Sequence, residues 1–440
     1  MLNVSHWLKW LLPLGFAIAI ALNFTDWNTN ASFFSGMLRA DNTALAFTGL
    51  LLSMALLLFL LAPRFHESLP ISRTETYAQQ LFALCGAICM VGFGNLSMLF
   101  IGIELLSISS YVLAGIDKQN LLSNEAALKY FLMGSFASGF LLFGITLIYA
   151  VTGSFDANII TQYAASHAGG SASPLFYGGI VLLLIAMSFK VSVAPFHFWA
   201  PDVYDGSPTN VTMFMAIIVK IAAFGAFLRL FACFLPLDNH IAFALSLLAV
   251  LSMTIGNLSA IWQNSFKRLL AYSGIAHAGY LLLGVLAANS AANAAVLYYS
   301  AAYGAASLAA FAVLLLITYQ YNTESRDGFK GLAKQNPFLA AVVVIAMLSL
   351  AGIPPTAGFF GKYYLFSLAV QAGYTWVVVL AVINSIISVF YYFGIMIAMF
   401  ADTPHDTPIA MPTAYKVVLA ISTAITLLLG CYPGLLLGIL

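Results

Sequence analysis

Five ionisable side chains lie inside stretches of sequence that are otherwise apolar. They are one carboxylate, three lysines and one histidine: Glu104, Lys190, Lys220, Lys362 and His277. A charged side chain at the centre of a bilayer costs about 2.5–3.5 kcal/mol on insertion scales, so such a residue is a candidate for function. Each of these side chains can bind and release a proton, as relay residues in membrane transporters do. The five residues are therefore a candidate path for protons through a membrane.

The carboxylate of Glu104 is the only one at the centre of an apolar run, LFIGIELLSISSYVLAG. An isolated charge in hydrocarbon is neutralised unless it finds a partner. The partner could be a neighbouring hydroxyl, from Ser107 or Ser109, or the ammonium group of Lys190. An opposite charge holds a lysine in its protonated form. A Glu104–Lys190 contact that forms and breaks would therefore act as a proton switch.

The other candidates have alternative interpretations. Lys190 and Lys220 could extend their long side chains to the membrane interface instead of exchanging protons within it. His277 lies in RLLAYSGIAHAGYLLLG, near Tyr272, Ser273 and Tyr280. It could be a proton relay or a hydrogen-bonded structural histidine.

Four charged residues next to the apolar runs have simpler interpretations. Glu125 and Lys129 are spaced i,i+4, a pair that supports a helix. Asp202 and Asp205 are expected to be capping or loop residues, although acidic groups at a pore mouth could also gather protons.

The composition indicates a membrane protein. The chain has 440 residues, of which 62% are apolar and only 7% are charged, whereas soluble domains are about 25% charged. The net charge of +1 argues against a nucleic-acid partner. The four cysteines lie in or beside apolar runs, and the sequence has no histidine pair at haem spacing, no iron–sulfur cysteine cluster and no glycine-rich phosphate loop. Redox chemistry is therefore expected in another chain, and no cofactor in this one.

The apolar runs predict an all-α, polytopic membrane protein. Thirteen spanning helices are expected, at residues 8–24, 43–62, 77–95, 97–116, 126–151, 174–198, 209–232, 241–262, 268–288, 293–319, 337–368, 374–400 and 413–438. The first run has no convincing cleavage site after it, so we expect it to be retained rather than removed as a signal peptide.

The thirteen basic residues near the loops, which exclude Lys190, Lys220 and Lys362 deep inside spans, predict the orientation of the chain. Two of them, Arg39 and Arg229, fall on one side of the membrane. Eleven fall on the other: Lys9, Arg64, Arg73, Lys118, Lys129, Lys267, Arg268, Arg326, Lys330, Lys334 and Lys416. The positive-inside rule then places the N-terminus in the cytoplasm, and an odd number of spans places the C-terminus outside.

Two predicted spans are expected to be discontinuous. Pro195 interrupts the sixth span near Lys190, and Pro354-Pro355 interrupt the eleventh near Lys362, about 160 residues later. Polar side chains or water should bind the freed backbone groups. The breaks lie five spans apart, so the units around them are oppositely oriented, as in the inverted repeats of membrane ion carriers. We expect N-terminal helices at 1–76, a first repeat at 77–233, a second at 234–400 and a last helix at 401–440.

Four motifs support a family assignment. They are GIELLSISSYVLAG, SFKVSVAPFHFWAPDVYDGSPTNV, KRLLAYSGIAHAGYLL and SLAGIPPTAGFFGKYY. Over residues 40–440 the chain resembles the subunit N family of the proton-pumping NADH–quinone oxidoreductase, respiratory complex I. Its more distant relatives are the subunits of Mrp cation/proton antiporters. The resemblance implies that Glu104 and Lys190 are the family's glutamate–lysine pair, Lys220 its central lysine and Lys362 its distal lysine.

The resemblance also implies a biological setting. The chain would lie in the cell inner membrane among other membrane subunits of the complex. NADH, flavin, iron–sulfur clusters and quinone would be bound by partner subunits. Two departures from the family are evident: one helix fewer near the N-terminus, and no basic residue after the tyrosines in FYYFGIMIAMF at 390–400.

The sequence therefore favours a subunit that moves protons along Glu104, Lys190, Lys220, His277 and Lys362, driven by quinone reduction in other subunits. A sodium/proton antiporter subunit of the Mrp type would share nearly every motif. A membrane scaffold that has lost pumping is disfavoured by the intact lysines near both breaks.

Overall fold

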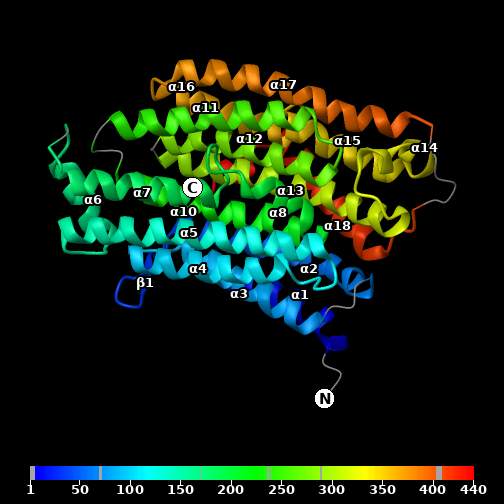
Figure 1. Ribbon diagram of the computed structural model, residues 1–440, viewed down its shortest axis with the longest axis horizontal. Helices are drawn as coiled ribbons and strands as arrows, with labels where there is room; N and C mark the ends of the chain where they lie inside the picture. The colour runs from blue at the N-terminus through cyan, green and yellow to red at the C-terminus, as the bar shows by residue number, and fades with distance from the viewer. Residues whose placement is uncertain are drawn as a thin grey trace.

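The computed structural model describes residues 5–68, 72–169, 171–234, 237, 239–287, 290–402 and 409–440. Long helices run side by side through the molecule (Figure 1). In chain order the helices of the first half are α1 Ser5–Thr25, α2 Asn42–Ser68, α3 Arg73–Val91, α4 Leu96–Ala114, α5 Leu121–Thr152, α6 Ala157–Ser166, α7 Pro174–Lys190, α8 Trp199–Gly206, α9 Thr209–Phe214, the π-helical η1 Met215–Val219 and α10 Lys220–Ala232.

The second half continues the same arrangement. Its helices are α11 Asn239–Ile261, α12 Phe266–Ala287, α13 Ser290–Tyr321, the 3-10 helix η2 Arg326–Phe329, α14 Leu332–Gln335, α15 Pro337–Ala351, α16 Ala357–Gln371, α17 Thr375–Phe400, α18 Thr413–Cys431 and α19 Gly434–Leu437. Helices α16 and α17 lie on one side of the bundle and α1 and α3 on the opposite side, with α10, α12 and α13 between them (Figure 1).

The only strands in the described residues form a small hairpin that the sequence did not predict. Strand β1 Ala31–Phe33 pairs in an antiparallel manner with β2 Leu38–Ala40. Three residues in the turn, Phe34, Ser35 and Gly36, have positive φ angles. The hairpin lies outside the apolar runs, so the predicted all-α membrane fold is confirmed apart from this short connection.

The helices match the predicted spans in position. Each of the thirteen apolar runs coincides with one helix or with two or three consecutive helical segments. In the described part of the chain, nine helices are long and apolar enough to cross a bilayer, and Trp10–Thr25, Pro174–Lys190 and Pro337–Ala351 are shorter apolar helices. The exact number of crossings stays a prediction.

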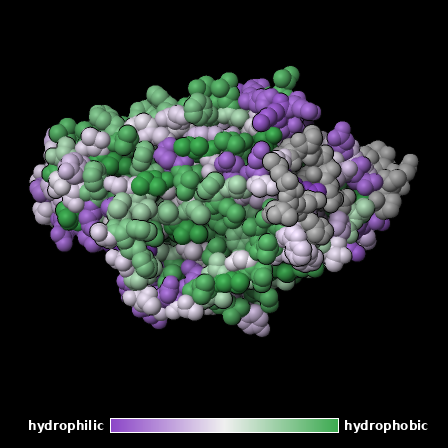
Figure 2. Space-filling model, turned by 90° about the horizontal axis from the view of Figure 1, so that it is seen from below, coloured by the Kyte–Doolittle hydropathy of each residue, from purple (hydrophilic) through white to green (hydrophobic). Residues whose placement is uncertain are grey.

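The outer and inner helices differ in what they bury. Helices α12 and α13 and the α9–α10 segment are almost wholly enclosed by other helices. Helix α5 instead exposes large apolar side chains such as Leu132 and Phe136, and α17 exposes Ile386 and Phe390. Figure 2 shows a broad hydrophobic area on the face seen from below. Such a surface is stable against lipid and would be unusually large for a soluble monomer.

Close backbone packing fixes two helix pairs, one in each half of the chain. In the α3–α4 pair, a Cβ atom on Gly86 would lie 2.6 Å from the backbone nitrogen of Leu106. In the α11–α12 pair, a Cβ atom on Gly256 would lie 2.6 Å from the backbone nitrogen of Ala276. Small residues allow such close approach of helices in membranes. Helices α4 and α12, which carry Glu104 and His277, are therefore held at fixed positions.

Both predicted helix breaks are present. Helix α7 ends at Lys190 and α8 begins only at Trp199, while α15 ends at Ala351 and α16 begins at Ala357. A third irregularity was not predicted: the span at 209–232 contains the π-helical segment Met215–Val219, which ends directly before Lys220. Single π-helical turns inside α-helices are frequent at functional sites.

The two ends of the bundle carry separate groups of ion pairs. At one end, near α6 and β1, Arg39 pairs with Asp156 and Arg229 with Asp41. The opposite end, which includes α14, carries the basic side chains Lys118, Lys129, Lys267, Arg268, Arg326, Lys330 and Lys334. We call this the basic end. The division agrees with the predicted distribution of charge, and which end faces the cytoplasm stays a prediction.

Candidate functional site

The four basic candidates are all buried inside the bundle. The exposed fractions are 7% for Lys190, 4% for Lys220, 3% for His277 and 4% for Lys362. The ammonium groups of all three lysines donate hydrogen bonds within the bundle. The structure therefore excludes the alternative in which Lys190 or Lys220 extends to the membrane interface.

Around the first break, two serines lie between the predicted glutamate–lysine pair. The Nζ of Lys190 donates to Ser107 Oγ over 2.7 Å. Glu104, one turn earlier on the same helix α4, accepts a hydrogen bond from Ser138 of α5. Within the described residues these groups form no direct ion pair. The hydroxyl expected to satisfy Glu104 comes from α5 and not from Ser107 or Ser109, a contact across 34 residues that local spacing could not reveal.

The freed backbone at the first break is bound by side chains, as predicted. The indole Nε1 of Trp199 donates to the carbonyl of Phe189 over 3.0 Å. Ser252 Oγ accepts from the backbone nitrogen of Ala194 over 2.8 Å. Helices whose ends lie in a membrane need such partners, because hydrocarbon offers none. Lys190 is therefore the last residue of a half-helix whose end is fully supported.

Lys220 contacts the helix that carries His277. Its Nζ donates to the carbonyl oxygen of Gly274 on α12 over 2.5 Å, and lies 5.4 Å from the centre of the Tyr303 ring on α13. Gly274 is glycine for a spatial reason, because a Cβ atom there would lie 2.8 Å from the Lys220 Nζ. Gly274 precedes His277 by three residues, so the two lie on the same face of α12.

His277 lies between two tyrosines. Its Nδ1 is 2.6 Å from the hydroxyl of Tyr299, and its Nε2 is 3.1 Å from the hydroxyl of Tyr392 on α17. The Tyr392 hydroxyl also bonds Ser273. A neutral imidazole has one nitrogen that donates and one that accepts, and the hydroxyls on both sides allow either tautomer.

Lys362 folds back onto the second break. Its Nζ donates to the carbonyl oxygen of Ala351, the last residue of α15, over 2.8 Å and to Ser385 Oγ over 2.7 Å. It also lies 4.7 Å from the centre of the Tyr280 ring. A backbone group freed by the break thus binds the lysine directly. The prediction that polar side chains meet the freed backbone is confirmed here too.

An asparagine connects the histidine region to the last lysine. Asn257 on α11 accepts from the Tyr391 hydroxyl over 2.9 Å and donates to the Tyr280 hydroxyl over 3.3 Å. Tyr391 adjoins Tyr392, the partner of His277, and the two rings lie 4.4 Å apart. Polar groups therefore follow one another from Lys220 through His277 to Lys362.

Sequence reasoning missed most of these connecting residues. It named Ser273 and Tyr280 because they neighbour His277 in sequence, but not Tyr299, Tyr303 or Tyr391. The available signal was the i,i+4 spacing of Tyr299 and Tyr303 in a helix that is rich in small and aliphatic residues. Such a pair places two hydroxyls on one helix face.

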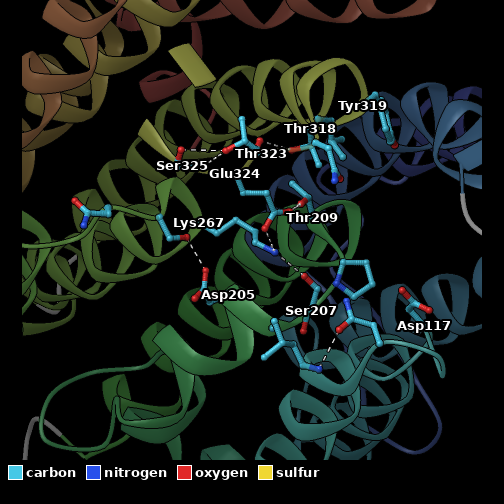
Figure 3. A pocket seen from close by; sticks show the side chains of 18 residues that line it. Asp117, Asp205, Ser207, Thr209, Lys267, Thr318, Tyr319, Thr323, Glu324 and Ser325 are labelled. Carbon is cyan, nitrogen blue, oxygen red and sulfur yellow. Dashed lines mark hydrogen bonds and ion pairs between the residues drawn. The ribbon is translucent and has the colours of Figure 1, made fainter. Parts of the chain in front are cut away.

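A pocket opens at the basic end (Figure 3). Its volume is about 750 Å³, and Ser207, Thr209, Lys267 and Glu324 are among its lining residues. Lys267 Nζ lies 2.7 Å from Glu324 Oε2 and donates to the Ser207 carbonyl over 3.0 Å, while Glu324 accepts from Thr209. The Ser207 hydroxyl is buried and has no partner among the described residues. A polar, roomy site with a free hydroxyl is one that water can occupy.

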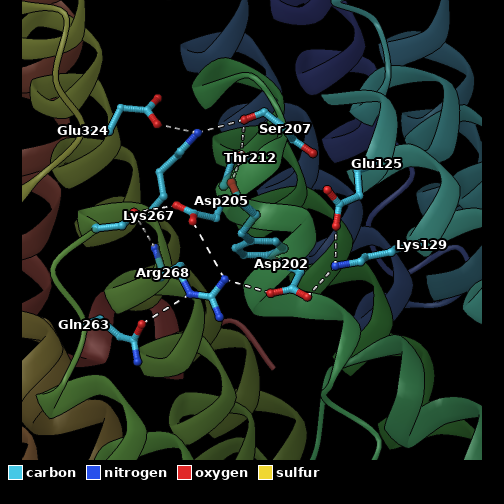
Figure 4. Close-up of polar contacts among 12 residues, drawn as sticks. Glu125, Lys129, Asp202, Asp205, Ser207, Thr212, Gln263, Lys267, Arg268 and Glu324 are labelled. Atoms are coloured by element: carbon cyan, nitrogen blue, oxygen red, sulfur yellow. Dashed lines mark hydrogen bonds and ion pairs between the residues drawn. The ribbon is translucent and has the colours of Figure 1, made fainter. Parts of the chain in front are cut away.

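Beside this pocket, charged residues join three helices (Figure 4). Asp202 on α8 bonds Lys129 of α5 over 2.9 Å and Arg268 of α12 over 2.8 Å. Burial alone would raise the pKa of Asp202, but the hydrogen bonds from Lys129 and Arg268 outweigh it and hold the pKa below its usual range. Asp202 therefore joins α5 and α12 through two ion pairs, a larger role than the capping or loop role expected from the sequence. The expected Glu125–Lys129 pair is present, at 2.7 Å.

The described residues contain no group of three or more His, Cys, Asp or Glu side chains placed to hold a metal ion. The lysine, histidine, tyrosine and carboxylate groups that are present can exchange protons, aided by water.

Two discontinuous helices with buried lysines at their breaks, in a bundle with a lipid-compatible surface, define a membrane ion carrier. Residues 94–388 match the model of the family described as NADH:quinone oxidoreductase/Mrp antiporter, TM. The chain belongs to this family of multi-pass membrane proteins.

Relatives named NADH-quinone oxidoreductase subunit N resemble nearly the whole chain. The one from Flavobacterium johnsoniae is 40% identical over 452 residues, which cover 100% of this chain and 96% of the relative. The one from Cytophaga hutchinsonii is 43% identical over 417 residues, which cover 94% and 90%.

Solved structures share the fold. A chain of respiratory complex I from Thermus thermophilus has a TM-score of 0.85 and 37% identity, over 98% of this chain and 93% of that one. A chain of the Mrp complex from Dietzia sp. has the same TM-score of 0.85 but 22% identity, over 99% and 91%. The second likeness shows the fold alone.

Proposed function

We propose that this chain is a proton-translocating membrane subunit of an NADH–quinone oxidoreductase. It would move protons along Glu104, Lys190, Lys220, His277 and Lys362, with the free energy supplied by quinone reduction in other subunits. The observation that carries the proposal is the run of buried polar contacts from Lys220 through His277 to Lys362. The subunit N relatives and the complex I structure support the setting.

The assembly follows from the same comparison. The partners would be the other membrane subunits of the complex, in the cell inner membrane, with the N-terminus in the cytoplasm and the C-terminus outside. NADH, flavin, iron–sulfur clusters and quinone would be held by partner subunits of the complex and not by this chain. Two inverted repeats, at 77–233 and 234–400, would each contribute one discontinuous helix.

The proposed path has two parts. In the first part, Lys190 bonds Ser107 and Glu104 bonds Ser138, whereas in the second part Lys220, His277 and Lys362 are linked by tyrosines and Asn257. Helices α7 and α10 are in contact, so a proton released by Lys190 would reach Lys220 between them. A lysine gives up its proton more readily inside hydrocarbon once its partner moves away, which makes each ammonium a step that can be switched.

The pocket at the basic end is the proposed supply of protons. Lys267 precedes Gly274 by seven residues and His277 by ten, so the three share a face of α12. Lys267 and Gly274 are about 10 Å apart along the axis. A water-filled pocket at Lys267 and Glu324 would therefore lie about two turns from the acceptor of Lys220.

Substitution of Lys220 tests the proposal. In the purified, assembled complex, Lys220→Ala should abolish most proton pumping and lower coupled quinone reduction at least tenfold, the scale on which acid–base groups act. Lys220→Arg should rescue poorly, because a guanidinium group does not release its proton in the working range. Normal pumping by an assembled Lys220→Ala complex would remove this residue from the path.

A sodium/proton antiporter subunit is the second candidate, favoured by the shared fold of the Mrp complex. Ion flux measured at fixed pH with sodium varied separates the two. Flux that requires sodium supports the antiporter, and flux that is indifferent to sodium supports the proton pump.

A further inference from the structure

Helix α17 carries no charged residue of its own, yet a guanidinium group lies against its backbone. Its sequence is TWVVVLAVINSIISVFYYFGIMIAMF. Arg326, in η2 at the basic end, donates from Nη2 to the carbonyl oxygen of Gly394 over 2.5 Å. A Cβ atom on residue 394 would lie 2.8 Å from that Nη2 and 3.0 Å from Cζ. The missing side chain of Gly394 is therefore the space that the guanidinium group occupies.

The arginine is held in place by the segment that carries it. The backbone nitrogen of Arg326 donates to the carbonyl of Asn264 over 3.0 Å. Two residues earlier, Glu324 accepts from the backbone nitrogen of Phe266 over 2.9 Å and pairs through its side chain with Lys267. The segment is thus fixed to the start of α12. The backbone of Arg326 is therefore fixed in place, and its side chain extends from there to α17.

Arg326 interacts with the Asp327 carboxylate through space but forms no ion pair with a carboxylate in the described part of the chain. Asp327, the next residue, pairs with Lys330 at 2.7 Å, and Asp402 pairs with Lys334 at 3.1 Å. A guanidinium group also stays protonated at every working pH. The backbone of α17 at Gly394 therefore faces a permanent positive charge.

The guanidinium group of Arg326 lies close to the polar residues that connect His277 and Lys362. Gly394 follows Tyr391 and Tyr392 by three and two residues, which is less than one helical turn. Tyr392 contacts His277, and Tyr391 contacts Asn257. The guanidinium group bound at Gly394 therefore lies between these tyrosines and the end of α17 at Phe400, which faces the basic end. Fixed positive charges beside a pore exclude protons and other cations.

We propose that Arg326 is an electrostatic barrier that stops protons on the His277–Lys362 part of the path from returning to the basic end along α17. The inference rests on the proposed function, because a barrier requires a proton path to protect. The charge comes from a loop 68 residues away and replaces one that α17 lacks.

The test uses the whole complex reconstituted in liposomes, with three readouts. These are NADH–quinone turnover, protons moved per electron, and the passive decay of an imposed pH gradient without NADH. Two variants alter the barrier in different ways. Arg326→Ala deletes the charge. Gly394→Ala displaces only the flexible tip of the arginine, so α17 itself should be unaffected.

Arg326→Ala should speed the passive decay on the order of tenfold, because a unit charge about 10 Å away changes a proton's population by about this factor at an effective dielectric of 20. Gly394→Ala keeps the charge and moves only the tip of the arginine, so it should speed the decay less. Turnover should stay within about twofold of the parent, while protons per electron fall. The double variant Arg326→Ala with Gly394→Arg, which places the charge on α17 itself, should restore the slow decay. Arg326→Lys keeps the charge without the planar fork and should restore it in part.

Three outcomes would overturn the barrier. The first is an assembled Arg326→Ala complex that holds its gradient as long as the parent. The second is a fall in turnover and pumping together with no rise in leak, which would make the arginine a structural clamp. The third is a double variant that leaks like Arg326→Ala. The proposed function fails separately, through normal pumping by Lys220→Ala, whatever the arginine variants do.

Discussion

The two discontinuous helices hold their lysines in different ways. Lys190 is the last residue before the first break, and its ammonium group binds the side chain of Ser107 on another helix. Lys362 follows the second break and folds back to bind the carbonyl of Ala351, at the end of the preceding half-helix. One lysine is held by a hydroxyl that can rotate. The other is held by a backbone group that cannot.

Because their hydrogen-bond partners differ, the two lysines are expected to differ in how easily they move. Ser107 lies one turn from Glu104, so Lys190 has a second, anionic partner within reach of a small movement. The carbonyl end of a helix carries partial negative charge in a fixed position, which favours a cation permanently. We infer that the ammonium group exchanges partners at the first break and is retained at the second.

Removal of each lysine should show the largest effect of this difference. Lys190→Met and Lys362→Met should both lower pumping more than tenfold, because each deletes a proton carrier. Only Lys362→Met should also lower the free energy of unfolding, by about 1–3 kcal/mol, because it leaves the Ala351 carbonyl with only the long hydrogen bond from Ser385, at 3.5 Å. Ser107 loses less, since its hydroxyl still donates to the Ile103 carbonyl over 2.5 Å.

Pumping in liposomes and thermal unfolding of the complex measure the two effects. Lys334→Met is the matched control, because Lys334 pairs with Asp402 at the exposed basic end. Equal losses of stability in the two lysine variants would contradict the distinction between the breaks.

The second prediction concerns the unit formed by Glu104 and Lys190. Glu104→Gln and Lys190→Met should each impair pumping, and the double variant should be much less than additively worse, because the second change affects a group that is already disabled. A double-mutant cycle on pumping rates measures this coupling. Strictly additive losses would mean that the two residues work separately.

The serines give a smaller, graded effect. Ser107→Ala removes the acceptor of Lys190 and should slow pumping several-fold. Ser385→Ala leaves Lys362 its Ala351 carbonyl and should slow pumping less than twofold. Pumping rates of the two assembled variants make the comparison, and an equal effect of both would show that the hydroxyls are interchangeable supports.

The smallest effect on pumping is expected from variants that remove only a side-chain hydrogen bond to the backbone at a helix break. Trp199→Phe removes the donor to the Phe189 carbonyl, yet retains an aromatic ring against Tyr130, which now lies 4.5 Å away. Stability should fall by about 1 kcal/mol, with pumping nearly unchanged. Ser349→Ala, which frees the Gly358 nitrogen at the other break, should behave alike. A pumping loss as large as that of Lys190→Met would place Trp199 in the path itself.

The sequence revealed the buried charges and both breaks because these are local signals. A lysine in an apolar run and a proline inside a helix are recognised without knowledge of the fold. The hydrogen-bond partners were mostly unpredictable. Ser138 bonds Glu104 across 34 residues, and Tyr392 contacts His277 across 115. Helical periodicity determines which face a residue occupies, but not which helix packs against it.

Helix α17 shows that the sequence can also fail to reveal a charge that the fold supplies from another segment. The absence of a basic residue in FYYFGIMIAMF cast doubt on any role for a charge there. The guanidinium group of Arg326 nevertheless lies against Gly394. Gly394, a glycine among aromatic residues, was the only sign of this contact in the sequence. The sign could not be interpreted without knowing that Arg326, 68 residues earlier, packs against it.

The π-helical segment Met215–Val219 has a consequence for the direction in which Lys220 points. A π turn accommodates one residue more than an α turn, and each residue advances a helix by about 100° around its axis. If the wide turn moved past Lys220, the lysine would rotate by about that angle and leave the Gly274 carbonyl. The helix therefore has a π turn directly before Lys220 that could allow this rotation. Rotation of a few residues would be enough to move the ammonium group of Lys220 from one hydrogen-bond partner to another.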